Sequence, residues 1–124
     1  MKRVLLSVAS FLFVAGTVSA IEPKGVLKTG EVKALVAAAQ TQADHLKLAR
    51  HFTATAEKHE AEAQEHEALA TSYRRNPRVS ETKQPMAPDT AAHCEYFAEH
   101  CRRAAKEMRA LAATHEEMAR NAGK

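Results

Sequence analysis

Side chains that bind soft metals recur at heptad spacing in the last third of the chain. One series is Cys94, Cys101, Met108 and His115. A second series, three residues later each time, is Phe97, Ala104, Leu111 and Met118. Residues spaced in this way lie on one face of a helix and pack against a partner helix. Thiolate and thioether sulfur favour Cu(I), and thiolate combined with imidazole suits zinc. The pattern therefore predicts either a helix core or a soft-metal site.

A matching series of rings lies earlier in the chain. It consists of His45, Phe52, His59, His66 and Tyr73. A column of small residues runs beside it, namely Ala49, Ala56, Ala63 and Ala70. Small residues let a second helix approach closely, so the neighbouring rings project into the interface. We therefore expect the two stretches to pack against each other.

Antiparallel packing, with Tyr73 opposite Thr90, brings two groups of candidate metal ligands together. The inner group is Cys94, Cys101, Met108, His59 and His66. The outer group is His45, His115 and Met118. Metal sites in helical bundles are commonly built from facing helices in this way. We interpret these eight residues as candidate ligands for copper or zinc, with an ordinary packed core as the alternative.

The two cysteines allow a further interpretation. Cys94 and Cys101 are separated by about 10.5 Å along a helix axis, too far for a disulfide within one intact helix. Free thiols rarely persist in an oxidising compartment without a use, so three options remain: a metal, burial, or disulfides between subunits. A two-fold axis near residues 97–98 would place Cys94 of one copy against Cys101 of another and link a dimer. The metal and the disulfide exclude each other at these sulfur atoms.

The elements that position these residues are predicted to be two long helices. Hydrophobic residues make up 45% of the chain, aromatic residues only 5%, and Ala, Glu, Lys, Arg and Gln are frequent. We expect an all-α fold, a long antiparallel helical hairpin within a single domain over residues 30–121. The helices cover about 30–75 and 90–120, the loop 76–89 carries three prolines, and residues 21–29 form an irregular leader. Because alanine buries little area, we expect dimerisation into a four-helix bundle.

The first 20 residues have the features of a secretory signal peptide. Lys2 and Arg3 precede an uncharged apolar stretch, and Val18-Ser19-Ala20 fits a cleavage site. We expect a periplasmic or secreted protein with no membrane association after cleavage; an uncleaved anchor is the alternative. Cleavage removes two of the cations behind the formal net charge of +3. With no basic patch interleaved with aromatic residues, nucleic-acid binding is not expected.

Several function classes are disfavoured by missing motifs. The chain has no Cys-x-x-Cys-His, no Cys-x-x-Cys, no Gly-rich phosphate loop and no nucleophile–base motif, so we expect a protein that is not an enzyme. The leading hypothesis is a dimeric metal-binding hairpin that buffers or senses copper or zinc. The alternatives are a structural or adaptor bundle with a protein partner and no metal, and a haem b protein ligated through His and Met. In architecture the expected hairpin resembles periplasmic helical-hairpin metal sensors and metal-resistance accessory proteins, although no motif of that group matches residue by residue.

Overall fold

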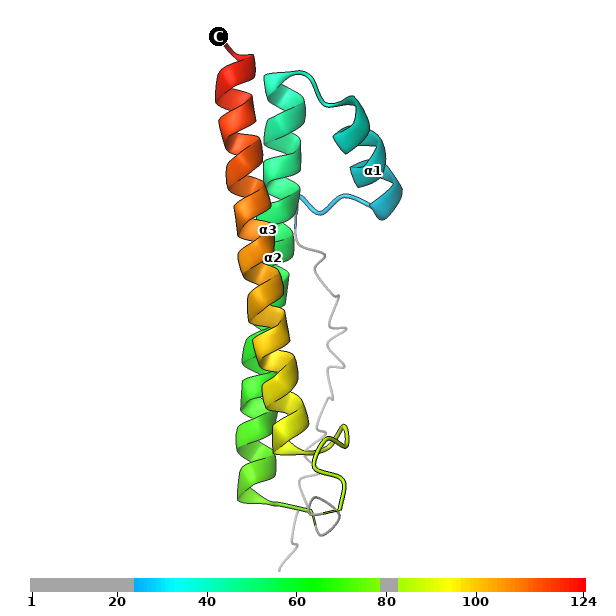
Figure 1. Cartoon of the computed structure of the whole chain (residues 1–124), viewed down its shortest axis with the longest axis vertical. Helices are drawn as coiled ribbons and strands as arrows, with labels where there is room; N and C mark the ends of the chain where they lie inside the picture. Colours follow the sequence, from blue (N-terminus) through cyan, green and yellow to red (C-terminus); the bar gives the residue numbers. More distant parts are fainter. Residues whose placement is uncertain (1–23, 79–82) are drawn as a thin grey trace, which may run out of the picture.

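The computed structural model describes residues 24–78 and 83–124, and this part of the chain folds into three helices. The helices are α1 (Thr29–Ala38), α2 (Gln42–Arg75) and α3 (Ala91–Ala122). Helices α2 and α3 run antiparallel along their length, and α1 packs on the first part of α2, on the side away from α3 (Figure 1). The predicted all-α hairpin is confirmed. The predicted signal peptide, residues 1–20, lies outside the described residues, as do 21–23 of the leader.

Local hydrogen bonds explain where the two long helices begin and end. Thr90 accepts a hydrogen bond from the His93 N–H at 3.2 Å and caps the start of α3. The Thr90 hydroxyl also lies 2.6 Å from the Pro85 carbonyl oxygen, which joins the loop to the helix. Helix α2 ends after Arg74 and Arg75, and the Asn76 N–H donates to the Ser72 carbonyl. Cations suit this end because the last carbonyls of a helix carry partial negative charge.

The predicted single helix over residues 30–75 is wrong, because the chain turns back between Ala38 and Gln42. The Thr41 hydroxyl accepts from the Asp44 N–H at 3.2 Å, and the Asp44 carboxylate accepts from the Thr41 N–H at 3.1 Å. This reciprocal pair is a capping box, which starts a new helix without Gly or Pro. The apolar residues before it therefore form α1, which packs on α2.

The core of the hairpin is built mostly from alanine. Among the described residues, the buried hydrophobic side chains are ten alanines, both cysteines and Leu48. Alanine columns from the two helices meet in this core: Ala49, Ala56, Ala63 and Ala70 from α2, and Ala91, Ala98, Ala105, Ala112 and Ala119 from α3. With no larger side chain between them, the two backbones approach closely. The predicted alanine column of α2 is thus confirmed as buried.

The predicted second series of α3 is wrong by one residue. Phe97, Leu111 and Met118 are 37%, 40% and 44% exposed, whereas the alanine that follows each of them is buried. The predicted series and the alanine series that follows it by one residue both fit a heptad repeat beside Cys94 and Cys101. Only the alanine series fits between the two helices, because their backbones are close. The larger apolar side chains therefore lie at the edge of the interface.

The two edges of the helix–helix interface differ in chemistry. On one edge, which we call the ion-pair flank, side chains bridge the helices in three pairs: Arg74–Glu95, Glu67–Arg102 and Glu60–Arg109. On the other edge, which we call the open flank, α3 presents Phe97, Ala104, Leu111 and Met118, and α2 presents Thr55, Glu62 and Leu69. Each flank follows the same seven-residue spacing, so both run the length of the hairpin.

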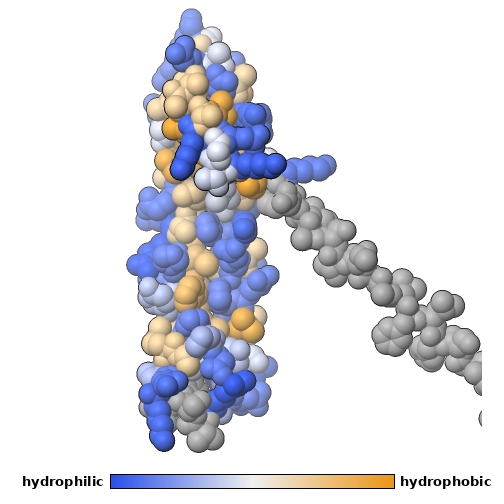
Figure 2. Space-filling model, turned by 90° about the vertical axis from the view of Figure 1, so that its right-hand side faces the viewer, coloured by the Kyte–Doolittle hydropathy of each residue, from blue (hydrophilic) through white to orange (hydrophobic). Residues whose placement is uncertain are grey.

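The molecular surface combines charged and apolar areas. In Figure 2 hydrophilic side chains flank a narrow apolar band along the long axis, and further apolar surface gathers at the end that carries α1. Within the described residues, no helix combines the length and the apolar character needed to cross a bilayer.

Candidate metal site

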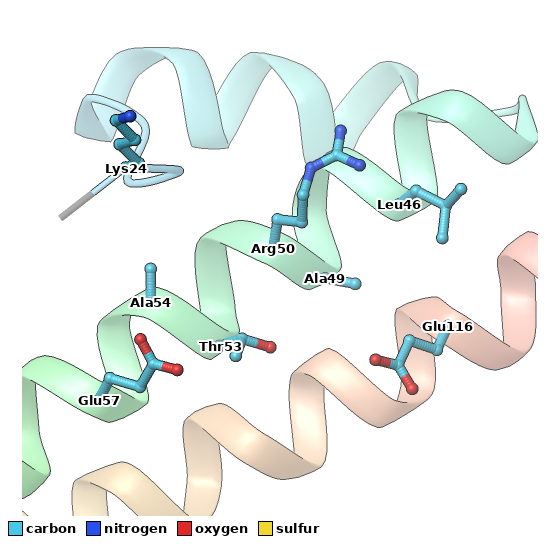
Figure 3. A pocket seen from close by; sticks show the side chains of 8 residues that line it. All are labelled: Lys24, Leu46, Ala49, Arg50, Thr53, Ala54, Glu57 and Glu116. Atoms are coloured by element: carbon cyan, nitrogen blue, oxygen red, sulfur yellow. The ribbon is translucent and has the colours of Figure 1, made fainter.

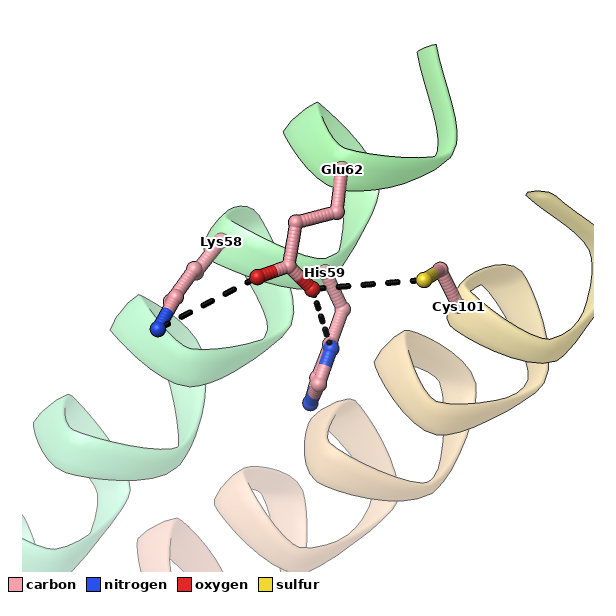
Figure 4. A network of polar contacts seen from close by, with 4 residues as sticks. All are labelled: Lys58, His59, Glu62 and Cys101. Carbon is pink, nitrogen blue, oxygen red and sulfur yellow. Dashed lines mark hydrogen bonds and ion pairs between the residues drawn. The ribbon is translucent and has the colours of Figure 1, made fainter. Parts of the chain in front are cut away.

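Three potential ligands from both long helices converge beside the middle of the interface. The His59 Nδ1 atom lies 3.1 Å from Glu62 Oε2, and the Cys101 Sγ atom lies 3.9 Å from the same oxygen. The ligand atoms of the three residues all lie within 4.8 Å of one another. Figure 4 shows that the Glu62 carboxylate lies between the imidazole and the thiol, with Lys58 on its outer side.

Helix geometry places each member of this group. His59 and Glu62 are one turn apart on α2, which brings their side chains together. Cys101 comes from the facing turn of α3 and is 8% exposed, next to the alanine columns. The His59 and Glu62 side chains are 30% and 38% exposed. The group is therefore walled by the helix interface on one side and accessible from the open flank on the other.

The spacing of these atoms is close to that of a tetrahedral metal site. Zinc binds nitrogen and oxygen at about 2.0–2.2 Å and sulfur at about 2.3 Å, which places tetrahedral ligands about 3.3–3.7 Å apart. The two distances to Glu62 Oε2, 3.1 and 3.9 Å, bracket this range.

The Cys101 thiol keeps its proton when no metal is bound. Burial raises the pKa of the Cys101 thiol, and the negative charge and hydrogen bond of Glu62 raise it further. The Cys101 thiol is thus neutral at physiological pH and donates toward the Glu62 carboxylate, as does the His59 ring when Nδ1 carries the hydrogen. A metal that binds here must displace the thiol proton, so its affinity would increase with pH.

The predicted inner group divides into two parts. Cys101 and His59 meet at the site, but Cys94 packs with Ala70, Ala91 and Tyr73 in an apolar cluster. Cys94 is 2% exposed, and burial raises the pKa of its thiol. Because both free thiols are enclosed between α2 and α3, disulfides between subunits would require the hairpin to open.

The other inner residues lie along the same interface. His66 stacks on Phe97 with 5.6 Å between ring centroids, and its buried Nδ1 atom has no hydrogen-bond partner. The predicted register, with Tyr73 opposite Thr90, also places His66 opposite Phe97, and this contact confirms that pairing. Met108 is half-buried one heptad beyond Cys101.

The predicted outer group is only partly assembled. His45 and His115 meet at the end of the hairpin, with 3.2 Å between their Nδ1 atoms, and Phe52 stacks on His115. Burial and the neighbouring His45 lower the pKa of His115, because both oppose a positive charge there. Met118 is 44% exposed on the open flank and belongs to the misassigned α3 series.

A separate shallow pocket lies where the segment before α1 crosses α2 and approaches α3. Figure 3 shows Lys24 and Arg50 near its rim, with Glu57 and Glu116 on the helices below. The lining combines two cations and two carboxylates with uncharged side chains. It therefore offers neither a set of metal ligands nor a net charge that would attract a charged ligand. We assign no function to this pocket.

The sequence interpretation missed Glu62. Its signal was present as His-x-x-Glu, a spacing that places both side chains on one face of a helix. Glu62 also sits one residue before Ala63 of the alanine column, which places it at the edge of the interface beside Cys101. The heptad series from which the candidate ligands were taken do not include position 62, and only the three-dimensional contact brings Glu62 together with His59 and Cys101.

Comparison of the chain with models of protein families, with characterised proteins and with solved structures returned no match. The functional argument therefore rests on the residues and their geometry.

Proposed function

We propose that the protein is an exported, non-catalytic hairpin that binds a transition metal through His59, Glu62 and Cys101, as a buffer or sensor. The observation that carries this proposal is the convergence of one imidazole, one carboxylate and one thiol within 4.8 Å. Export rests on the signal peptide predicted over residues 1–20.

Zinc fits this donor set better than copper. A carboxylate oxygen is a hard donor, which Cu(I) does not favour, whereas Zn²⁺ accepts sulfur, nitrogen and oxygen together. Three protein ligands leave a fourth tetrahedral position for water or another molecule. An accessible site with an open position is consistent with a protein that takes up and releases metal, rather than one that needs metal in order to fold.

The proposal predicts that Zn²⁺ stabilises the folded protein. A ligand at about 100 times its dissociation constant adds about 2.7 kcal/mol, which corresponds to a rise of about 10 °C or more in Tm for a domain of this size. His59→Ala should abolish the rise. His66→Ala is the matched control, because His66 lies one heptad away in the same ring column and packs on Phe97. Equal responses in the two variants would show that the site is wrong.

We also propose that the protein is a homodimer that forms a four-helix bundle. The core of one hairpin is mostly alanine, and each alanine buries little apolar area. The alternative function is a structural or adaptor bundle without metal. The exposed large apolar side chains of the open flank favour this alternative, because they offer a surface to a protein partner. That alternative predicts no shift in Tm with Zn²⁺ in the wild-type protein.

A further inference from the structure

The hairpin places its small apolar side chains inside and several of its large ones outside. Ten of the buried hydrophobic side chains in the described part of the chain are alanines, while Phe97, Leu111 and Met118 are 37–44% exposed on the open flank. Leu69, across the interface on α2, is 45% exposed. Exposed large apolar residues at regular spacing along one face are typical of an interaction surface.

The neighbouring rings make this surface continuous rather than scattered. Phe97 contacts His93 and Tyr96, with ring centroids 4.6 and 5.5 Å away, and it stacks on His66 from α2. Tyr96 is itself 53% exposed. Aromatic side chains bury much area at little cost in conformational entropy, which makes them frequent anchors in protein interfaces.

Other edges of the hairpin are occupied in part. On the ion-pair flank, Arg109 makes two hydrogen bonds to Glu60, at 3.1 and 2.7 Å, and two further Arg–Glu pairs continue the series. Helix α1 covers part of the outer side of α2 and makes no element contact with α3. Within residues 24–78 and 83–124, Phe97, Leu111 and Met118 of the open flank thus remain 37–44% exposed.

We propose that a second copy of this chain docks on the open flank, with the two α3 helices antiparallel across a two-fold axis that passes between Glu107 and Met108. This arrangement rests on the proposed homodimer, and because Glu62 lies on the same flank, docking of a second copy would narrow the access to the metal site. It identifies the face and the register of that dimer.

The spacing of the α3 series is complementary to itself in this register. Phe97 of one copy lies opposite Met118 of the other, and Ala104 lies opposite Leu111, each pair occurring twice by symmetry. The one small residue of the series thus meets a large one. A shift by one heptad would place Ala104 opposite Ala104, leaving a gap at the axis and two end residues without partners.

The size of the face fits a stable dimer. At 1.5 Å per residue, the 32 residues of α3 extend about 48 Å. Two adjacent helices are about 20 Å wide, so the face offers roughly 900 Å². A standard interface buries about 800 Å² per partner. A second copy matches the full length of this face, which a short peptide segment would not.

The experiment is sedimentation equilibrium of the processed, metal-free protein under reducing conditions, which remove any contribution from zinc or disulfides. The wild-type protein should be a dimer. Leu111→Glu should raise the dimer dissociation constant by more than about a hundredfold, because each substitution buries two charges in a symmetric interface. Leu46→Glu is the matched control, since Leu46 is 38% exposed on α2 outside the open flank, and it should remain dimeric.

Circular dichroism would establish that the Leu111→Glu variant is still helical. If that variant unfolds, a second variant tests the register in its place: Ala104→Cys combined with Leu111→Cys should give covalent dimers on mild oxidation. A monomeric wild-type protein would overturn the dimer itself. If the Leu111→Glu variant remains dimeric, or if the double-cysteine variant does not cross-link, the open flank is not the dimer interface and the dimer must form through another face.

Discussion

Arginine–glutamate pairs close one flank of the α2–α3 hairpin, whereas the opposite flank carries Phe97, Leu111 and Met118 beside a His–Glu–Cys group. Both flanks repeat every seven residues next to the same alanine columns. The ion-pair flank satisfies its charges within one chain and faces water. The open flank leaves large apolar side chains uncovered and a ligand set accessible. We propose that the open flank carries the function, whereas the ion-pair flank, whose side chains are about half exposed, contributes little to stability.

The largest loss of stability is expected for a substitution in the alanine columns, which lie between the two flanks. Ala105→Leu inserts three carbon atoms at a position that is 2% exposed, between closely spaced backbones. Overpacking of this kind should lower the free energy of unfolding by about 1–3 kcal/mol, measured by urea denaturation. Ala110→Leu, on the exposed side of α3, is the control and should cost little. A larger loss for Ala110→Leu than for Ala105→Leu would mean that the alanine columns do not form the core.

Acid should weaken the end of the hairpin where His45 meets His115. Burial lowers the pKa of His115 and of His51, so the folded protein favours their neutral forms. The Leu27 N–H also donates to His51 Nδ1 at 2.9 Å, which requires that nitrogen to be unprotonated. The unfolded chain binds more protons below its ordinary pKa of about 6.5, so stability should fall as pH drops through and below that value.

This pH effect can be assigned with a matched pair of variants. His115→Gln should reduce the dependence of the unfolding midpoint on pH between neutral and mildly acidic conditions. His100→Gln should leave it unchanged, because His100 is exposed on α3. An identical pH profile in His115→Gln and the wild-type protein would contradict a folded-state role for the neutral His115 ring.

The smallest effect is expected on the ion-pair flank. Arg109→Gln removes the contacts with Glu60, but both side chains are about half exposed and solvent screens their interaction. The unfolding midpoint should change little at moderate salt, and the metal response and the dimer should persist. A large loss of helix or of the dimer in this variant would show that the ion-pair flank is required for helix pairing or for dimerisation.

Much of the fold could be predicted from sequence, because heptad spacing and loop prolines determine a hairpin. The pairing of His66 with Phe97 and the neighbourhood of His45 and His115 followed from the antiparallel register. The sequence did not determine whether the series that includes Phe97 or the series that includes Ala98 is buried, because both spacings fit a helix face. Hydropathy favours phenylalanine, and only the close approach of two alanine-lined backbones favours the alternative.

The candidate site was predictable in part. His59 and Cys101 were expected to be close, but Glu62 was overlooked because an isolated carboxylate on a helix usually faces water. Cys94 and Cys101 share a heptad position, yet one packs in an apolar cluster and the other contacts a carboxylate. That distinction depends on the residues of α2 opposite each thiol, which the spacing along α3 alone does not contain.

The most direct test of the metal site is a Co²⁺ titration followed by absorption spectroscopy on the reduced protein. Cobalt takes the tetrahedral sites that zinc prefers and shows a charge-transfer band when thiolate binds it. The account predicts this band for the wild-type protein and for Cys94→Ser, and its loss in Cys101→Ser. A band that survives in Cys101→Ser but disappears in Cys94→Ser, or no band in the wild-type protein, would contradict the site formed by His59, Glu62 and Cys101.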